Sequence, residues 1–151
     1  MRPQGSDGRR PEPPPIGGVL ETALYVDDLP RAATFYEATL GLKRIFADDR
    51  LAAFEAGPRS VLLLFRRGST LETVTMPGGT IPPHDGHGPL HIALAIAATD
   101  LESWETHLAS SGIAVEGRTA WPKGGTSIYF RDPDGHLIEL ATPGLWPNYS
   151  A

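Results

Sequence analysis

Residues 18–42, GVLETALYVDDLPRAATFYEATLGL, decide the fold because they join a strand pattern directly to a helix pattern. The apolar residues of 18–26 predict a strand. Asp28 offers an N-cap oxygen ahead of Pro30, apolar residues then recur at helical spacing, and Gly41 ends the helix. Three short apolar runs follow between turn residues, at about 42–47, 51–55 and 60–66. Together these patterns predict a β-α-β-β-β unit.

The same order of elements returns after a segment rich in Gly and Pro, MPGGTIPPHDGHG, which predicts a linker that acts as a lid or bridges two subunits. A strand over PLHIALAIA, a helix with a Thr99 and Glu102 capping box, and three more strands at about 113–121, 126–131 and 136–142 follow. We therefore divide the chain into a disordered tail at 1–16, a domain at 17–142 and a second tail at 143–151. Within the domain, module one covers about 17–66, the linker about 67–88 and module two about 89–142.

Composition narrows the possible functions. The chain has 151 residues, a net charge of −5 and no cysteine. An acidic balance disfavours nucleic acid as a partner, and no apolar run approaches the roughly 20 residues of a membrane span. Without cysteine, disulfides, iron–sulfur clusters and thiolate zinc sites are excluded, so a metal site must use His, Asp or Glu. The lack of cysteine also fits a reducing interior, and we expect a cytoplasmic location.

The two modules can be laid on each other, and the overlay aligns potential metal ligands. ALYV at 23–26 matches ALAI at 93–96, which places Glu21 on His91. VLLL at 61–64 matches LIEL at 137–140, which places Leu63 on Glu139. Because strand side chains alternate between faces, these positions point away from the aliphatic face that packs beneath a helix. The pattern predicts that they surround one concave surface.

Three stretches resemble the vicinal oxygen chelate superfamily, which includes glyoxalase I, fosfomycin-resistance enzymes, extradiol dioxygenases and bleomycin-resistance proteins. They are YVDDLPRAATFYEATLGL, GPLHIALAI and YFRDPDGHLIEL, of which the last is the most specific. The resemblance implies an α+β fold of two βαβββ modules whose mixed sheets curl into an open cup, with helices on the outer faces. It also implies a homodimer that takes a small-molecule substrate. The cup forms within one chain in some members and across two chains in others, and both arrangements stay open here.

The resemblance also assigns roles to single residues. It implies that Glu21, His91 and Glu139 bind one divalent metal ion, with Fe, Mn, Zn and Mg all compatible with such ligands. Leu63 stands where glyoxalase I has a fourth carboxylate ligand, and an alkyl side chain cannot bind metal. Tyr129 corresponds to a pocket tyrosine of the fosfomycin enzymes, so we expect it to act as a hydrogen-bond donor or acid. The expected pocket wall consists of Tyr25, Leu63, Phe65 and Trp121.

These residues favour a metal-dependent dioxygenase, lyase or isomerase whose small substrate chelates the metal through adjacent oxygens. The alternative is a metal-free protein of the bleomycin-resistance type that binds and sequesters a small molecule. Taken singly, Glu21 and Glu139 could serve in ion pairs, and His91 could be a buried, hydrogen-bonded histidine. We expect His84 and His87 to lie in a solvated loop, and His107 and His136 to lie on the surface.

Overall fold

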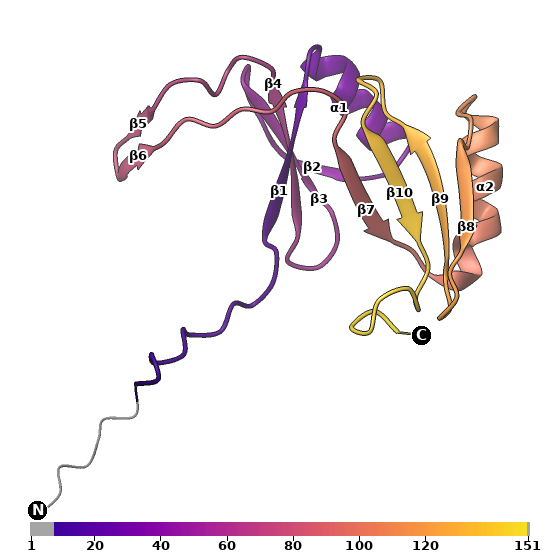
Figure 1. Cartoon of the computed structure of the whole chain (residues 1–151). Helices are drawn as coiled ribbons and strands as arrows, with labels where there is room; N and C mark the ends of the chain where they lie inside the picture. The colour runs from indigo at the N-terminus through magenta and orange to yellow at the C-terminus, as the bar shows by residue number, and fades with distance from the viewer. Residues whose placement is uncertain (1–7, 151) are drawn as a thin grey trace, which may run out of the picture.

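Two four-stranded sheets with the same strand order make up most of the computed structural model, which describes residues 8–150 (Figure 1). The first sheet has the order β1-β4-β3-β2, and the second has the order β7-β10-β9-β8. The strands of the first sheet are β1 (Glu21–Val26), β2 (Lys43–Ala47), β3 (Leu51–Glu55) and β4 (Val61–Arg66). Those of the second are β7 (His91–Ala95), β8 (Gly117–Ala120), β9 (Thr126–Arg131) and β10 (Leu137–Ala141).

The internal repeat is confirmed by the register of the strands. In each sheet the first and last strands of the module pair in parallel, and the other pairs are antiparallel. Ala23 lies opposite Leu63 in the first sheet, just as Ala93 lies opposite Glu139 in the second. Leu63 and Glu139 therefore occupy equivalent places, and the α+β fold of two βαβββ modules is confirmed. The two sheets are not hydrogen-bonded to each other within the described part of the chain.

The two helices begin in different ways. Helix α1 (Leu29–Ala38) starts at Asp28, whose carboxylate accepts a hydrogen bond of 3.0 Å from the Arg31 N–H, as the sequence predicts. Helix α2 (Leu101–Ser110) follows a short 3-10 turn, η1 (Ala98–Asp100), which makes Asp100 the N-cap residue. Its side chain makes no capping bond. The predicted capping box is therefore wrong, because the 3-10 turn moves the start of the helix past Thr99.

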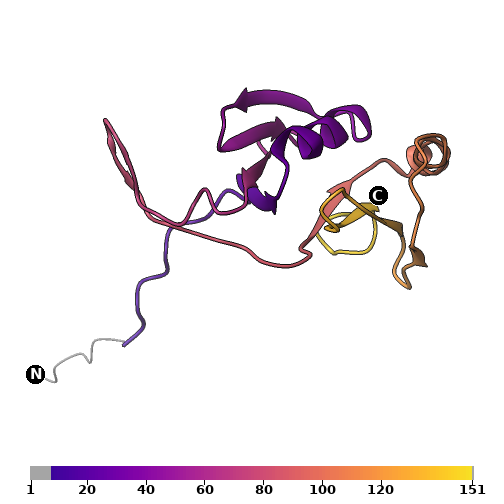
Figure 2. The same cartoon turned by 90° about the horizontal axis from the view of Figure 1, so that it is seen from above.

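Helix α1 lies between the two sheets and joins them into one hydrophobic core (Figures 1 and 2). The ring of Tyr36 lies 6.2 Å from that of Phe54 in β3, and the ring of Phe35 lies 6.4 Å from that of Phe130 in β9. The strands contribute alternate residues to this core, namely Leu24, Val26, Ala52, Phe54, Leu62, Leu64, Ile128, Phe130, Ile138 and Leu140. The intervening residues of the same strands therefore form a second face on each sheet, turned away from α1.

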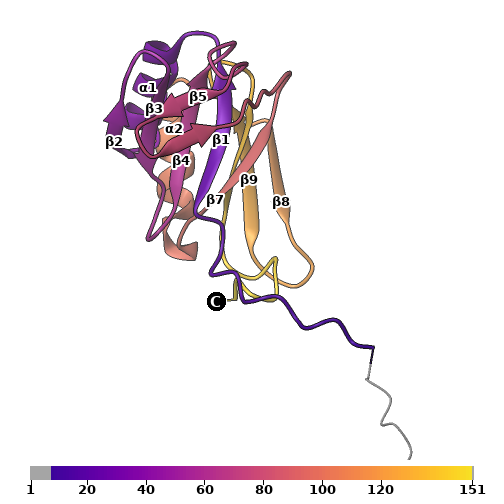
Figure 3. The same cartoon turned by 90° about the vertical axis from the view of Figure 1, so that its left-hand side faces the viewer.

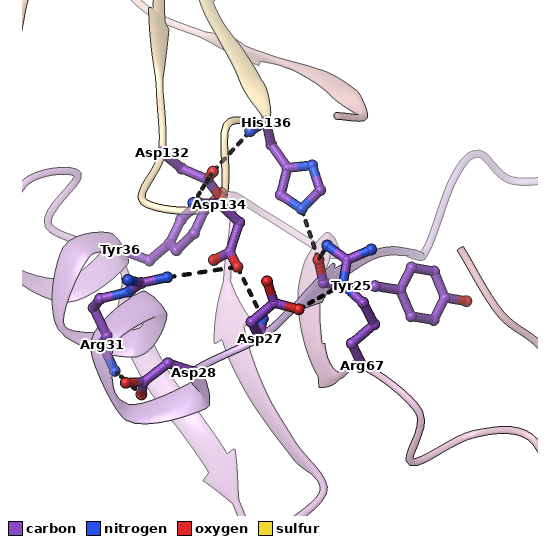
Figure 4. Close-up of polar contacts among 9 residues, drawn as sticks. All are labelled: Tyr25, Asp27, Asp28, Arg31, Tyr36, Arg67, Asp132, Asp134 and His136. Carbon is purple, nitrogen blue, oxygen red and sulfur yellow. Dashed lines mark hydrogen bonds and ion pairs between the residues drawn. The ribbon is translucent and has the colours of Figure 1, made fainter. Parts of the chain in front are cut away.

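A polar network also holds the second module against the first (Figure 4). The tight turn after β9 supplies two buried carboxylates. Asp132 accepts a hydrogen bond of 2.8 Å from the Tyr36 hydroxyl of α1, and Asp134 accepts one of 2.8 Å from the Asp27 N–H. These bonds offset part of the cost of burying the two carboxylates, although Oδ2 of Asp134 has no hydrogen-bond partner among the described residues. The two bonds fix the turn against Tyr36 near the end of α1 and against Asp27 just before the helix.

His136 belongs to this network and is fully buried, so the prediction that it lies on the surface is wrong. Its Nδ1 accepts a hydrogen bond of 2.8 Å from the Leu90 N–H. Its Nε2 lies 2.7 Å from the carbonyl oxygen of Tyr25, and because a carbonyl only accepts, Nε2 carries the proton. The imidazole thus links β7 to the end of β1.

The linker contains a hairpin that the sequence did not indicate. Strands β5 (Val74–Met76) and β6 (Gly79–Ile81) pair antiparallel and extend away from the rest of the chain (Figures 1 and 3). At the base of the hairpin, Thr70 and His84 share two hydrogen bonds, one of them 2.9 Å long from the His84 N–H to the Thr70 carbonyl. The linker is therefore anchored at its base and projects beyond it.

The two tails differ. Of the predicted N-terminal tail, residues 8–16 are exposed and carry no helix or strand, while residues 1–7 lie outside the described residues. In the C-terminal tail, the Tyr149 hydroxyl bonds the carbonyls of Ile96 and Ala141 at 3.1 and 2.8 Å, which holds the segment against the second sheet. Among the helices of residues 8–150, none is both long and apolar enough to cross a bilayer.

Candidate functional site

His91 and Glu139 meet on the open face of the second sheet. They lie on the neighbouring strands β7 and β10, where Glu139 pairs with Ala93, two residues beyond His91. Strand alternation points both side chains away from the core that Ile138 and Leu140 enter. The Nε2 of His91 lies 3.2 Å from the Oε1 of Glu139. The structure thus joins two of the three ligands that the sequence predicts.

The protonation of His91 shows what this pair can hold. Its Nδ1 lies 2.9 Å from the Leu137 carbonyl oxygen, which can only accept, so Nδ1 carries a proton. In a neutral imidazole the lone pair of Nε2 then faces the Glu139 carboxylate, and two acceptors in contact need a proton or a cation between them. Two ligands bound to one ion at about 2.1 Å lie about 3.0–3.4 Å apart. The observed separation therefore fits a shared divalent cation.

The second oxygen of Glu139 has partners that the sequence analysis missed. Ser127 donates a hydrogen bond of 2.5 Å to Oε2, and the indole N–H of Trp121 donates one of 2.8 Å to the Ser127 hydroxyl. Glu139 is only 5% exposed and Ser127 is fully buried. The period of the strand offered a signal, because Ser127 is two residues from Tyr129 in β9 and so shares its face.

Tyr129 lies beside the histidine and the glutamate. It is directly opposite Glu139 in the β9–β10 pair, and its ring lies 6.4 Å from that of His91. These residues line a hollow of about 830 Å³ together with the predicted wall residue Trp121. The rest of the lining is mostly apolar or aromatic, and no Lys or Arg is found among the described residues that line it: Val19, Ala93, Leu94, Ala95, Ala141, Leu145, Trp146, Asn148 and Tyr149.

The C-terminal tail closes one side of this hollow. Trp146 forms part of its wall while remaining 63% exposed, and Tyr149 lies beneath it. Burial raises the pKa of Tyr149. The two aromatic residues in the tail were the signal for its docking. Nothing in the sequence indicated that Asn148 would also reach the hollow.

Glu21 does not join His91 and Glu139 within one chain. The described residues contain no group of three His, Asp or Glu side chains able to hold a metal ion. Glu21 begins β1 in the first sheet, whose strands do not pair with those of the second. Val19, two residues earlier, reaches the hollow, whereas Glu21 is not part of its lining. The predicted three-ligand site therefore stays a prediction that needs more than one chain in this arrangement.

Three of the predicted wall residues lie on the open face of the first sheet and not in this hollow. Tyr25 and Phe65 are neighbours across β1 and β4, with stacked rings 6.0 Å apart, and Leu63 lies two residues before Phe65. His84 covers both rings, because its Nδ1 lies 2.5 Å from the Tyr25 hydroxyl and its ring 4.8 Å from that of Phe65. His84 is therefore packed on the sheet and is not the solvated loop residue that we expected.

The environment of Tyr25 keeps its hydroxyl protonated. Burial raises its pKa, and the nearby negative charge of Asp85 raises it further. A neutral phenol can share a proton with the ring nitrogen of His84. The first sheet thus offers an aromatic surface with a hydrogen-bonding group at its end, and the second sheet offers the His91–Glu139 pair.

Comparison with known proteins gives a consistent result. Metallothiol transferase FosB from Bacillus licheniformis is 31% identical over 132 residues, which cover 87% of this chain and 79% of that protein. Glutathione transferase FosA from Serratia marcescens is 29% identical over 125 residues, covering 81% and 78%. The crystal structure of lactoylglutathione lyase from Agrobacterium tumefaciens superposes with a TM-score of 0.80 at 32% identity, covering 89% of this chain and 99% of that one.

The family model that matches describes the glyoxalase/bleomycin resistance protein/dioxygenase superfamily, and it covers residues 18–140. This range contains both modules, His91 and Glu139. The repeat of the two modules, the strand order of the two sheets and the match over most of the chain agree. This chain therefore belongs to the glyoxalase/bleomycin resistance protein/dioxygenase superfamily, the vicinal oxygen chelate superfamily.

Proposed function

We propose that this chain is a metal-dependent enzyme that acts on a small substrate with adjacent oxygen atoms, and that His91 and Glu139 are two of its metal ligands. The observation that carries the proposal is the contact of 3.2 Å between Nε2 of His91 and Oε1 of Glu139 inside an open hollow, where the neutral imidazole directs its lone pair at the carboxylate. The names of the similar proteins, among them two transferases and a lyase, favour non-oxidative chemistry over the dioxygenase branch.

The third ligand in this proposal is Glu21 of a second copy of the chain. Strands β1 and β7 are both edge strands, so each has one side without a hydrogen-bonded neighbour in the described sheets. The open faces of both sheets also point away from the core that α1 fills. A homodimer that places β1 of one copy beside β7 of the other covers both edges and brings Glu21 toward the His91–Glu139 pair.

Each residue of the hollow then has a distinct task. His91 and Glu139 would hold a divalent cation, which would supply Lewis acidity at the substrate oxygens. One imidazole and two carboxylates match a doubly charged cation and leave positions for the substrate. Tyr129, next to Glu139, donates a hydrogen bond or a proton to the substrate. Trp121 and Trp146 offer apolar walls that exclude water from the reacting atoms.

Metal content tests the proposal directly. The full-length protein, purified without chelators, is expected to contain about one divalent ion per chain, measured by inductively coupled plasma mass spectrometry. Glu139→Gln keeps the size of the side chain but removes its charge, so the metal content should fall to a small fraction of the wild-type value. Glu102→Gln, a change at an exposed carboxylate on α2, is the matched control and should keep the metal.

Circular dichroism should show that both variants remain folded. A wild type without bound metal that also fails to bind added Mn²⁺ or Zn²⁺ would exclude the proposal. The same result follows if Glu139→Gln, while folded, keeps its full metal content.

A second candidate is a metal-free protein that binds and sequesters a small aromatic molecule. It is supported by the aromatic walls of the hollow and by the absence of cationic side chains from its described lining. Quenching of tryptophan fluorescence by an aromatic ligand in the metal-free wild type, unchanged by Glu139→Gln, would favour this candidate. Loss of binding in that variant would favour the metal enzyme.

A further inference from the structure

Glu139 carries its two oxygens in different environments, and one of them is held by a chain of two hydrogen bonds. The indole N–H of Trp121 donates to the Ser127 hydroxyl at 2.8 Å, and that hydroxyl donates to Oε2 of Glu139 at 2.5 Å. The other oxygen, Oε1, faces His91 at 3.2 Å. The two oxygens therefore have separate tasks, one structural and one directed at the hollow.

The indole of Trp121 sets the direction of both hydrogen bonds. An indole nitrogen can only donate a hydrogen bond, so it occupies an acceptor site of the Ser127 hydroxyl. The single hydroxyl proton is then left for Glu139. Ser127 is fully buried, so its partners come from the protein and not from bulk solvent. A hydrogen bond to an ionised carboxylate is about twice as strong as one between neutral groups, which makes the orientation of Glu139 firm.

We propose that Ser127 and Trp121 are positioning residues of the metal site, which hold Oε2 of Glu139 so that Oε1 is directed at the cation. This inference rests on the proposed function, because it takes Glu139 to be a ligand. Without the Ser127 hydroxyl, the buried carboxylate loses the donor that fixes its orientation, and a ligand that can rotate binds a metal less tightly. Neither residue contacts the metal in this proposal.

Metal affinity, measured by calorimetric titration of the full-length protein with MnCl₂, provides the test. Ser127→Ala removes one hydroxyl and should raise the Kd for Mn²⁺ by about 10-fold or more, the usual effect of losing a partner of a metal ligand. Trp121→Phe keeps an aromatic ring but loses the N–H, and should raise the Kd by about 3- to 10-fold. Because Trp121 acts on Glu139 only through the Ser127 hydroxyl, the double variant should bind Mn²⁺ about as weakly as Ser127→Ala alone.

Two control variants separate this effect from a general loss of stability. Ser110→Ala, at the exposed end of α2, and Trp104→Phe, on the same helix, make the same chemical changes away from the hollow. Both should keep the wild-type Kd. If Ser127 had only a structural role, Ser127→Ala would lower the melting temperature of the protein and leave the Kd of the folded protein for Mn²⁺ unchanged. If Ser127→Ala does not fold, Trp121→Phe carries the test, because its side chain is only half-buried.

The outcomes are distinct. A wild type that binds Mn²⁺ beside a folded Ser127→Ala with the same Kd overturns this inference and leaves the proposed function intact. The inference is also overturned if the fold-increases in Kd from Ser127→Ala and Trp121→Phe multiply in the double variant, because the two residues would then act independently. A wild type that binds no metal overturns the proposed function and this inference with it.

Discussion

At the scale of single residues, hydrogen bonds to buried carboxylates join the two modules and shape the candidate metal site. The carboxylates of Asp132 and Glu139 lie on β9–β10 or its turn, and each is held by a hydroxyl group, from Tyr36 and Ser127 respectively. A buried carboxylate without such a donor would cost several kcal/mol of desolvation. A hydroxyl–carboxylate hydrogen bond therefore has two roles in this protein. With Asp132 it joins the two modules, and with Glu139 it supports the candidate metal site.

Tyr36 gives a prediction for stability at high pH. Burial, followed by the charge of Asp132, raises the pKa of its phenol far above the ordinary value of 10.0. Below about pH 10 the phenol is protonated in both the folded and unfolded chains, so its contribution to stability is constant. Above that pH the unfolded chain releases the proton while the folded chain keeps it. Stability should then fall by up to about 1.4 kcal/mol per pH unit from this residue.

Tyr36→Phe should remove this part of the pH dependence. The variant should be less stable by about 1–3 kcal/mol at pH 8, because Oδ2 of Asp132 loses its donor, but its stability should decline less steeply above pH 10. Urea denaturation of both proteins from pH 8 to pH 11 measures this. Curves that stay parallel over the whole range would contradict the assignment.

At the scale of secondary-structure elements, the linker is attached more closely to the first sheet than its composition suggested. Residues 84–86 lie over the open face of that sheet, where Arg67 bonds the carbonyls of Gly86 and Tyr25 at 3.2 and 3.1 Å. Gly86 itself packs against the ring of Tyr25 so closely that a Cβ atom built there would lie 2.3 Å from it. The segment is therefore seated on β1, while the hairpin beyond it projects outward.

Gly86→Ala tests this seating. The added methyl group forces the Tyr25 ring or the linker to move, and we expect a loss of about 1–3 kcal/mol in the free energy of unfolding. Gly78→Ala, in the turn of the hairpin, adds the same methyl group where no atom lies within 4 Å, and should change stability by less than about 0.5 kcal/mol. Chemical denaturation compares the two variants. Equal stabilities would mean that the linker does not rest on Tyr25.

The elements also show what the sequence could and could not predict. Helix α1, the strand order and the meeting of His91 with Glu139 were predictable, because apolar periodicity and the repeat act within each module. The burial of His136 was not, because it depends on a carbonyl 111 residues away, at Tyr25. The hairpin escaped notice because its strands have three residues each and stand among Pro and Gly. The place of Glu21 could not be predicted, because among the described residues it lies in the other sheet and completes no three-ligand group with His91 and Glu139.

At the scale of the whole molecule, the edges and open faces of the two sheets bear on the proposed homodimer. Each sheet has one face in the core and one open face, and β1 and β7 both end their sheets. Exposed apolar residues lie along the first sheet and the projecting linker, namely Val19, Leu20, Ile45, Phe46, Leu71, Met76 and Ile81. Exposed apolar surface of this kind is typical of interaction sites, and the proposed homodimer would cover part of it.

Mixing two inactive variants tests whether the metal site is shared between copies. Glu21→Ala and His91→Ala should each lose tight metal binding. In a shared site, a mixed dimer pairs the intact Glu21 of one chain with the intact His91 of the other, so unfolding and refolding an equal mixture should restore up to one ion per mixed dimer. Calorimetric titration with MnCl₂ measures the number of sites. A mixture that binds no more than its components would place the complete site within one chain.

The division of each strand between a core face and an open face has a consequence for how this protein can change over evolutionary time. Core positions and open-face positions alternate along β1, β4, β9 and β10. Neighbouring residues are therefore under different selective pressures, one for the fold and one for the lining of the open face. Replacing Ala23 or Ala93 alters the lining of the open surface without creating a void beneath α1. New specificities can therefore arise from single substitutions at odd-numbered positions while the even-numbered partners keep the molecule intact.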